Sequence, residues 1–364
     1  MKSAINVSQY LGTRIPIRKV WSLFLRSDEA VRQTVRWGVI AVLAATLSCA
    51  IAACSSPGSA PPQPSQAIAL GPRSSQPVSS SLQFTFRTVD NSADPTFNRL
   101  LGINNEGRVG GYYGSGATGH PNRGYIVYPP YQPTNFRNEN FPSAVSTQVT
   151  SLNNKHFVGG FYIDTQGRTL GFLEWKGIWF SYVAPHVRRA KPVTELLGLN
   201  DAGFAVGFYL ATPSRSVAFQ LNEPSGVFKT IKVPGAQGAV ATGITGRGHI
   251  VGYVQNASSN VVGFLFKQGT FKEFSYPGST DTRALAVTTF DRIVGSYVDG
   301  SGATHGFYVT GAGTKKAVWQ TIDDPNATGE TVVSGINIHA NLVGYYVDSA
   351  GNNHGFIASL KAQR

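Results

Sequence analysis

The stretch Ser334-Gly-Ile-Asn-Ile-His-Ala-Asn-Leu-Val-Gly-Tyr-Tyr-Val-Asp-Ser-Ala-Gly-Asn-Asn-His-Gly-Phe-Ile357 decides the fold of this chain. It predicts three short β-strands: one that ends at 335–336, a second from Leu342 to Val347 and a third from His354 to Ile357. Turns rich in Asn and Gly separate these segments, which is typical of antiparallel strands joined by tight connections.

The same phrase occurs five more times upstream, and the copies align on one glycine of the second strand. The aligned glycines are Gly111, Gly160, Gly207, Gly252, Gly295 and Gly344. The intervals between them are 49, 47, 45, 43 and 49 residues. A small residue followed by an aromatic one comes 13 residues after this glycine in the first copy and 11 after it in the others. So constant an interval predicts a hairpin of fixed geometry. We expect the aligned glycines to allow close approach of an aromatic residue of the next blade.

A fourth strand of the form aromatic-x-x-apolar-x-x-Pro follows in most copies, as in Phe228 to Pro234 and Trp319 to Pro325. Four strands in about 45 residues is the size of a propeller blade. The last copy lacks this strand, and Phe86-Arg-Thr-Val-Asp90, which precedes the first copy, could supply it. Because closure removes exposed sheet edges, we expect the last blade to take this strand from the N-terminal side.

The sequence therefore predicts an all-β fold: a six-bladed β-propeller of four-stranded blades over residues 82–364, closed by the strand at 84–90. The expected repeats are about 100–146, 147–193, 194–240, 241–284, 285–331 and 332–364.

The repeat elements Gly-Ile-Asn, Val-Gly-Tyr-Tyr-Val-Asp, His-Gly-Phe and Phe/Trp-x-x-Ile-Asp-x-Pro resemble those of the HAF family of probable extracellular repeats. The resemblance covers essentially all of 82–364, although the first four copies lack the His of the small-aromatic pair and Asp291-Arg292 replaces a clear turn in the fifth. It implies an exported bacterial protein and no defined activity.

Residues 1–53 have the pattern of an export leader. An apolar run from Trp37 to Ala53 follows Arg32 and Arg36, as in a secretory signal. The segment Ile51-Ala-Ala-Cys54-Ser resembles a bacterial lipobox, which implies lipidation of Cys54 and cleavage before it. An uncleaved transmembrane anchor is the alternative. The 36 residues before the apolar run are many for a signal, and a translation start at Val31 or Val35 would explain them.

Residues 54–81 are rich in Ser and Pro, which predicts a disordered tether. By resemblance to lipoproteins of diderm bacteria, Ser55 favours the outer membrane, so we expect a chain held in the cell envelope by its lipid anchor.

Beyond the leader, 24 basic and 17 acidic residues remain, a mild excess of positive charge that does not indicate nucleic-acid binding. We expect a monomer. Both cysteines lie at or before position 54, so the propeller has no disulfide.

No nucleophile elbow, zinc motif, phosphate-binding loop or Cys-x-x-Cys occurs, so the sequence predicts no catalytic residue, cofactor or metal site. Asp164, Asp299 and Asp348 begin Asp-x-x-Gly turns that lack the further acids of a calcium loop. His305 and His354 occupy one slot in neighbouring copies and are expected to pack and hydrogen-bond within the fold. A carboxylate pair assembled from distant positions stays open.

Departures from the repeat are better candidates for a binding surface, since irregular loops on rigid scaffolds often bind partners. One candidate is a basic patch on one face, made of His120, Arg123, Arg188, Arg189 and Lys191. The other is the loop on the opposite face that carries Tyr128 and Tyr131. Ordinary solvated loops are the simpler interpretation of both.

Two functions follow from these observations. The first is a membrane-tethered binding or scaffold module for a protein or glycan partner. The alternative is a polysaccharide hydrolase or lyase with its site at the channel mouth, which a cluster of buried acids around the central axis would favour.

Overall fold

The computed structural model describes residues 82–361 except 188–190 and 257, so the leader, Cys54, the tether, Arg188 and Arg189 lie outside the described residues. The described chain is all-β apart from a single 3-10 turn, Pro133–Asn135. Successive groups of four strands follow the sequence repeats. The strands of the first three groups are β2 (Asn98–Ile103), β3 (Val109–Tyr113), β4 (Arg123–Val127), β5 (Phe136–Asn138); β6 (Ser146–Leu152), β7 (Val158–Ile163), β8 (Thr169–Trp175), β9 (Ile178–Tyr182); β10 (Thr194–Leu199), β11 (Phe204–Thr212), β12 (Arg215–Asn222) and β13 (Val227–Thr230).

The remaining strands continue the pattern. They are β14 (Gly238–Ile244), β15 (Ile250–Gln255), β16 (Val261–Lys267), β17 (Thr270–Phe274); β18 (Asp281–Val287), β19 (Ile293–Val298), β20 (Thr304–Thr310), β21 (Val318–Ile322); and β22 (Thr331–Ile336), β23 (Leu342–Val347), β24 (Asn353–Leu360), which β1 (Phe84–Thr88) joins. Four sheets have four strands each, and β14–β21 share one sheet of eight. A single parallel pair, Val261 with Asp281, joins β14–β17 to β18–β21 in that sheet.

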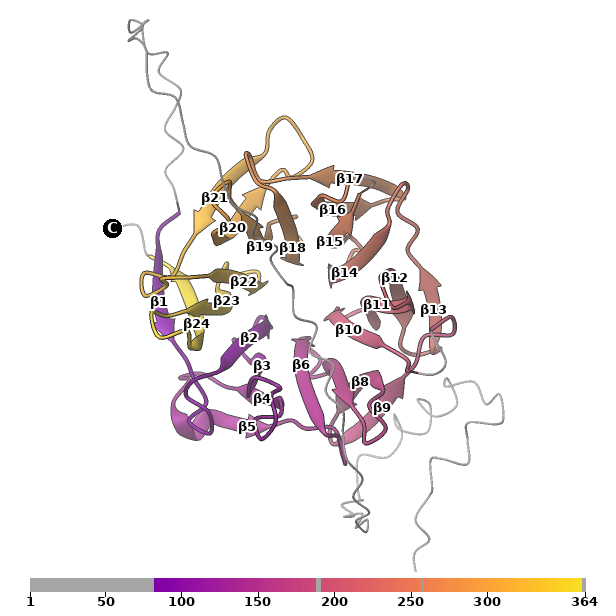
Figure 1. Cartoon of the computed structure of the whole chain (residues 1–364), viewed down its shortest axis with the longest axis vertical. Coiled ribbons are helices and arrows are strands. Elements are labelled where there is room, and N and C mark those ends of the chain that lie inside the picture. The colour runs from indigo at the N-terminus through magenta and orange to yellow at the C-terminus, as the bar shows by residue number, and fades with distance from the viewer. Residues whose placement is uncertain (1–81, 188–190, 257, 362–364) are drawn as a thin grey trace, which may run out of the picture.

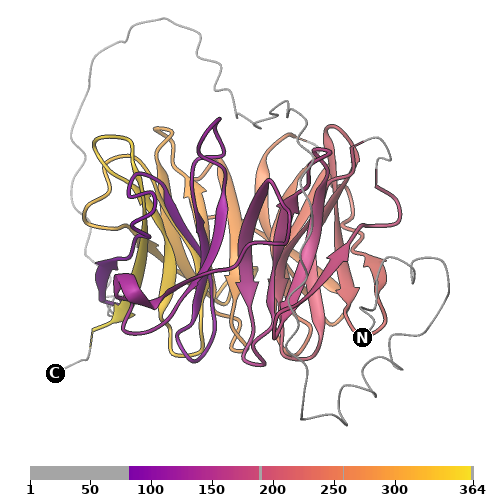
Figure 2. The same ribbon diagram turned by 90° about the horizontal axis from the view of Figure 1, so that it is seen from below.

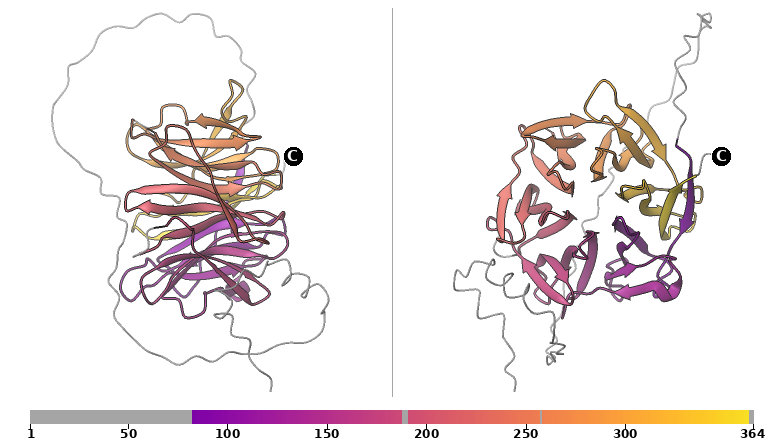
Figure 3. Two further views of the ribbon diagram at one scale, coloured as in Figure 1. Left: turned by 90° about the vertical axis from the view of Figure 1, so that its right-hand side faces the viewer. Right: turned by 180° about the vertical axis from the view of Figure 1, so that it is seen from behind.

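The sheets stand around a common axis in a propeller-like arrangement, with the first strand of each group innermost (Figure 1). Seen from the side, the strands run between two faces of a disc, and the turns lie on those faces (Figure 2). The first and last sequence repeats meet, because β2 contacts β22, β23 and β24. The view from behind shows β1 lying along the outside of the last sheet (Figure 3, right).

The strand at the N-terminal side completes the last sheet as its sequence predicts. β1 pairs antiparallel with β24 from Phe84 opposite Leu360 to Thr88 opposite Phe356. The third strand of the opening stretch is longer than the expected His354 to Ile357, because β24 extends to Leu360 to pair with β1. Phe86 packs its ring 5.5 Å from that of Phe356, so the seam has its own aromatic contact.

The aligned glycines are needed for a different contact from the one that spacing alone suggests. We expected them to admit an aromatic ring of the neighbouring blade, and this is wrong. A Cβ atom at Gly344 would lie 1.9 Å from the carbonyl oxygen of Val332 and 2.8 Å from the ring of Phe356, both in the same sheet. A β-bulge between Val333 and Gly335 brings the first strand this close.

The aromatic residue of each small-aromatic pair is fully buried, and burying each such ring stabilises the fold by about 1.5–3 kcal/mol. The set is Tyr125, Phe172, Phe219, Phe264, Phe307 and Phe356.

A ladder of asparagine side chains links neighbouring sheets at the turn after the first strand. The carboxamide oxygen of Asn153 accepts hydrogen bonds from the N–H groups of its own turn, at Lys155 and Phe157. Its Nδ2 donates to the carbonyl of Asn200 in the next sheet, at 3.0 Å. The same cross-sheet bond runs from Asn104, Asn200 and Asn337. These residues cap turns and also join the sheets.

No helix among the described residues is long and apolar enough to cross a membrane.

Candidate functional site: a polar cleft between two sheets

A cleft lies between the β2–β5 sheet and the β6–β9 sheet, and we call it the first cleft. Its volume is about 550 Å³. The walls come from the turn after the inner strand, from the ends of the third and fourth strands, and from the same parts of the next repeat. The lining residues are Glu106, Arg108, Ile126, Tyr128, Pro129, Arg137, Glu139, His156, Glu174 and Lys176. Most carry hydrogen-bonding groups, so the cleft is suited to a polar ligand.

Arg108 is held in the first cleft by the side chains of His156 and Tyr128. Its Nη1 contacts Nδ1 of His156, its Nη2 lies 3.4 Å from the hydroxyl of Tyr128, and its guanidinium carbon lies 5.1 Å from the centre of that ring. The Nε atom is buried and has no hydrogen-bond partner among the described residues. No carboxylate of the described residues forms a direct salt bridge with this guanidinium, although its charge acts on nearby Glu139, so the guanidinium can still contact an anionic ligand group.

The loop that carries Tyr128 and Tyr131 is fixed in place. The hydroxyl of Tyr131 donates to the carbonyl of Gly107 at 2.8 Å, and Arg87 of β1 donates to the carbonyls of Pro130 and Tyr131 at 2.8 and 3.1 Å. Tyr128 and Arg108 are therefore positioned before any ligand arrives, which lowers the entropic cost of binding.

Glu139 and Glu174 form a buried carboxyl pair in the wall of the first cleft. Their side chains are 6% and 7% exposed. Burial raises the pKa of Glu139 to about 7, and the charge of Glu174 and a hydrogen bond between the two carboxyls add to the rise, against the opposing effect of Arg137. Such a bond requires a proton on one of the two groups. At neutral pH the pair can therefore donate as well as accept hydrogen bonds.

A second cleft lies one repeat later, between the β6–β9 and β10–β13 sheets, and has a volume of about 260 Å³. It includes Glu223, which is 6% exposed and whose Oε1 has no hydrogen-bond partner in the described part of the chain. Burial raises the pKa of Glu223 to about 7, and the nearby charge of Lys155 only partly offsets this.

In the part of the chain that the structure describes, the inner strands do not carry the cluster of buried acids that would have favoured an enzyme at the channel mouth. Equivalent positions of the inner strands carry Arg99, Glu195 and Arg283, each one residue before the position opposite the aligned glycine. Burial raises the pKa of Glu195 to about 8. Arg99 stacks at 4.1 Å over the ring of Tyr345 and donates to Asn353.

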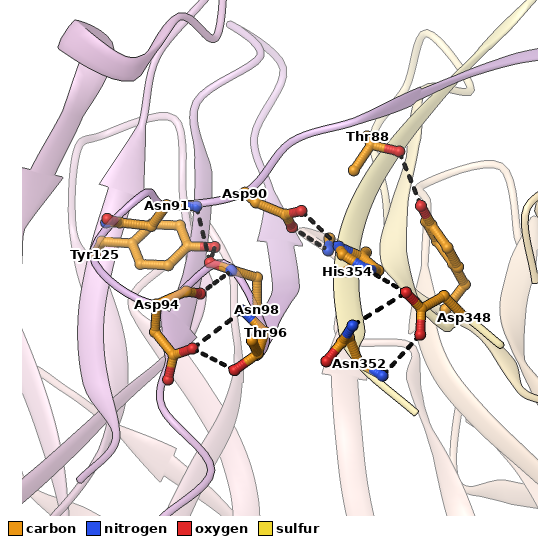
Figure 4. Close-up of polar contacts among 12 residues, drawn as sticks. Thr88, Asp90, Asn91, Asp94, Thr96, Asn98, Tyr125, Asp348, Asn352 and His354 are labelled. Atoms are coloured by element: carbon orange, nitrogen blue, oxygen red, sulfur yellow. Dashed lines mark hydrogen bonds and ion pairs between the residues drawn. The ribbon is translucent and has the colours of Figure 1, made fainter. Parts of the chain in front are cut away.

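His354 and His305 act in the fold, as predicted from their repeat position. His354 lies between two carboxylates: Nδ1 is 2.7 Å from Asp90 and Nε2 is 3.2 Å from Asp348 (Figure 4). Burial opposes the charged form of His354, but the hydrogen bonds to Asp90 and Asp348 outweigh it and raise its pKa. His305 makes the equivalent contacts with Asp323 and Asp299, at 2.9 and 3.4 Å.

Asp164, Asp299 and Asp348 cap their own turns, which confirms the turn interpretation. No group of three or more His, Cys, Asp or Glu side chains in the described residues could hold a metal ion.

Of the two predicted binding surfaces, the loop of Tyr128 and Tyr131 lies at the first cleft and the described residues of the basic patch do not. Tyr128 lines the first cleft, whereas Tyr131 supports it from the side. His120 is exposed and lies 3.6 Å from Asp94. Lys191 is exposed, and no hydrogen bond or ion pair within the described residues joins it to His120 or Arg123.

The two buried acids of the first cleft were not predicted from the sequence, although a signal was present. Glu174 stands where the other repeats have Val127, Leu221, Phe266, Val309 and Ala358, and Glu139 stands where they have Val89, Tyr182, Ile231, Phe274 and Ile322. An acid in an apolar column of a repeat is a departure that marks a site.

No protein-family model matches this chain, and no curated protein is similar to it in sequence. Solved structures with a similar chain path include a mutant of AofleA from Arthrobotrys oligospora (11% identity, 78% of this chain and 88% of that chain, TM-score 0.44) and a mutant of the Aleuria aurantia lectin AAL (11%, 73% and 95%, 0.45). TolB from Acinetobacter baumannii is a third (9%, 73% and 64%, 0.43). Similarities this remote carry no argument about the activity of this chain.

Proposed function

We propose that this protein is a lipid-anchored, glycan-binding module of the bacterial cell envelope, built as a six-bladed β-propeller of the HAF type. In this interpretation the eight-stranded sheet is two blades joined by the single Val261–Asp281 pair, and β1 closes the ring. Cys54 carries the lipid, and residues 55–81 form the tether. The protein acts as a monomer and does not bind nucleic acid.

One observation carries the binding proposal: the first cleft has a volume of about 550 Å³, hydrogen bonds hold the loop of Tyr128 in place, and Nε of Arg108 has no hydrogen-bond partner among the described residues. Glycans present many hydroxyl groups, which pair with carboxyl, guanidinium and imidazole side chains. Tyr128 adds an aromatic surface beside them. A folded protein partner would favour a flatter and more apolar surface than this cleft.

A glycan array made from envelope and extracellular polysaccharides tests the proposal, with the full chain as the probe. Arg108→Gln should weaken binding by at least about 10-fold, because hydrogen bonds to a charged group contribute about 1.5–3 kcal/mol. Arg247→Gln is the matched control, since Arg247 is exposed on the corresponding turn of another repeat. An array without signal, or equal losses in both variants, would refute the proposal.

A polysaccharide hydrolase or lyase is the second candidate, and the Glu139–Glu174 pair is the observation that favours it. A carboxyl group with a pKa of about 7 can serve as a general acid at neutral pH. In this candidate the site lies in the first cleft instead of at the channel mouth. Incubation with the polysaccharides bound on the array decides: new reducing ends or unsaturated products that vanish in Glu139→Gln would establish catalysis, and intact polymer would exclude it for those substrates.

A further inference from the structure

The second cleft is built from the same parts as the first, one repeat later in the chain. The first cleft takes its buried acids from Glu139 at the end of a fourth strand and Glu174 at the end of a third strand. The second takes buried Glu223, just after the third strand of the following repeat. Each cleft also has an acid from a turn after an inner strand, Glu106 in the first and Asp201 in the second. In each cleft a cation comes from the turn after an inner strand: Arg108 in the first and Lys155 in the second.

The two clefts are the two sides of one sheet. Lys155 and Trp175 line the second cleft, whereas the residues that follow them, His156 and Lys176, line the first. Both pairs lie at the turns that follow β6 and β8, and each pair divides its two side chains between the clefts. Only the edge of the β6–β9 sheet, at the turn of residues 153–157, separates them. Since packed sheets lie about 10 Å apart, the cleft centres are separated by roughly that distance.

Each cleft contains a buried polar group that the described chain leaves without a partner. In the first cleft it is Nε of Arg108, and in the second it is Oε1 of Glu223. Buried polar atoms are nearly always paired, so two such atoms in adjacent clefts indicate groups that a ligand supplies. Both clefts also contain an acid whose pKa burial raises to about 7. Near neutral pH these acids are partly protonated. They can therefore donate hydrogen bonds, and they repel an anion less than ionised carboxylates would.

We propose that the two clefts are paired subsites for a single acidic, uronate-type glycan chain that crosses the edge of the β6–β9 sheet. The sugar carboxylates contact Arg108 in the first cleft and Lys155 in the second. The ring hydroxyls accept hydrogen bonds from the protonated acids Glu139 and Glu223. This proposal rests on the proposed glycan-binding function and adds to it the charge of the glycan and the length that the site requires.

Titration calorimetry on the full chain tests it with two probe series from monomer to hexamer: oligogalacturonides and neutral cello-oligosaccharides. The acidic series should bind more tightly, and its affinity should rise by about 100-fold or more at the length that reaches both clefts, because the second contact becomes intramolecular. Lys155→Met should remove this gain in the long oligomers and leave the short ones unchanged. Arg108→Gln should weaken binding at every length.

Each other outcome overturns a separate part of the proposal. Affinity that does not depend on length, or a gain that persists in Lys155→Met with an unchanged melting temperature, rejects the pairing of the clefts. Neutral oligomers that bind as tightly as acidic ones reject the uronate assignment and leave glycan binding standing. If neither series binds and the glycan array is also blank, the proposed function itself fails.

Discussion

Replacing Glu223 by glutamine should stabilise the protein at neutral and alkaline pH and have little effect in acid. Glu223 is 6% exposed, and no cation neutralises it by direct contact among the described residues. Its pKa is about 7 in the folded protein, compared with an ordinary value of 4.5. The folded state therefore holds a proton that the unfolded state releases between these values, and the stability of the wild type falls as the pH rises through this window.

The size of the effect follows from the difference between the two pKa values. A difference of about 2.5 pKa units lowers the free energy of unfolding of the wild type by about 3 kcal/mol at pH 7 and above. Below about pH 4 the free energy of unfolding is unaffected. Glutamine keeps the shape and the polar character of the side chain but does not titrate. With an unfolding entropy of about 2.1 cal/mol/K per residue, we expect the melting temperature of Glu223→Gln to exceed that of the wild type by roughly 5 °C near pH 8.

The assay is thermal and urea unfolding of both proteins from about pH 4.5 to 8.5, spanning the window in which the two pKa values lie. Glu273→Gln is the matched control, since Glu273 is exposed on β17 and its loss should change stability by less than about 0.5 kcal/mol. Equal stability of Glu223→Gln and wild type across the range would refute the reasoning. So would a loss of stability that grows with pH.

Further predictions concern the ladder, the seam, the anchor and the cleft. Asn153→Ala should cost about 1–2 kcal/mol more in urea unfolding than Asn256→Ala, because both side chains cap a turn but only Asn153 also bonds the next sheet; equal costs would remove the ladder's role. His354→Gln should cost more stability near pH 5.5 than near pH 8.5, since the raised pKa of His354 stabilises the fold below pH 6.5 and this gain is lost as the pH rises; a larger cost in alkali would contradict it. Cys54→Ala should release the chain from the membrane fraction, and unchanged retention would reject the lipid anchor. For glycans too short to reach Glu223 in the second cleft, the affinity of the wild type should fall as the pH rises through about 7, as the raised pKa of Glu139 predicts, whereas that of Glu139→Gln should not; parallel profiles would exclude the carboxyl pair from binding.

The strands and the seam could be predicted from sequence because each depends on local patterns that repeat. Alternation of side chains, Asn-Gly turns and the constant interval after Gly344 define hairpins without reference to distant residues. The strand at 84–90 was recognised as the missing piece because it matches Trp319 to Asp323 residue by residue, including Asp90, which binds His354 as Asp323 binds His305.

The clefts could not be predicted in the same way, because their walls come from residues that lie far apart in the chain. Glu139 and Glu174 meet only when two sheets pack, and Arg108 reaches His156 across the same interface. Both acids do interrupt apolar columns of the repeat, so a column-by-column comparison of the copies would have singled them out. The irregular loops were predicted to be the binding surfaces. Of the described residues named in them, Tyr128 alone lines the first cleft.

A crystal structure of the full chain with a bound oligogalacturonide tests the central claim most directly. We predict density for the sugar in the first cleft, between the β2–β5 and β6–β9 sheets, with a carboxylate on the guanidinium of Arg108 and a hydroxyl on the Glu139–Glu174 pair. Density at the central axis beside Glu195, or on the face that carries His120, with the first cleft empty, would contradict it.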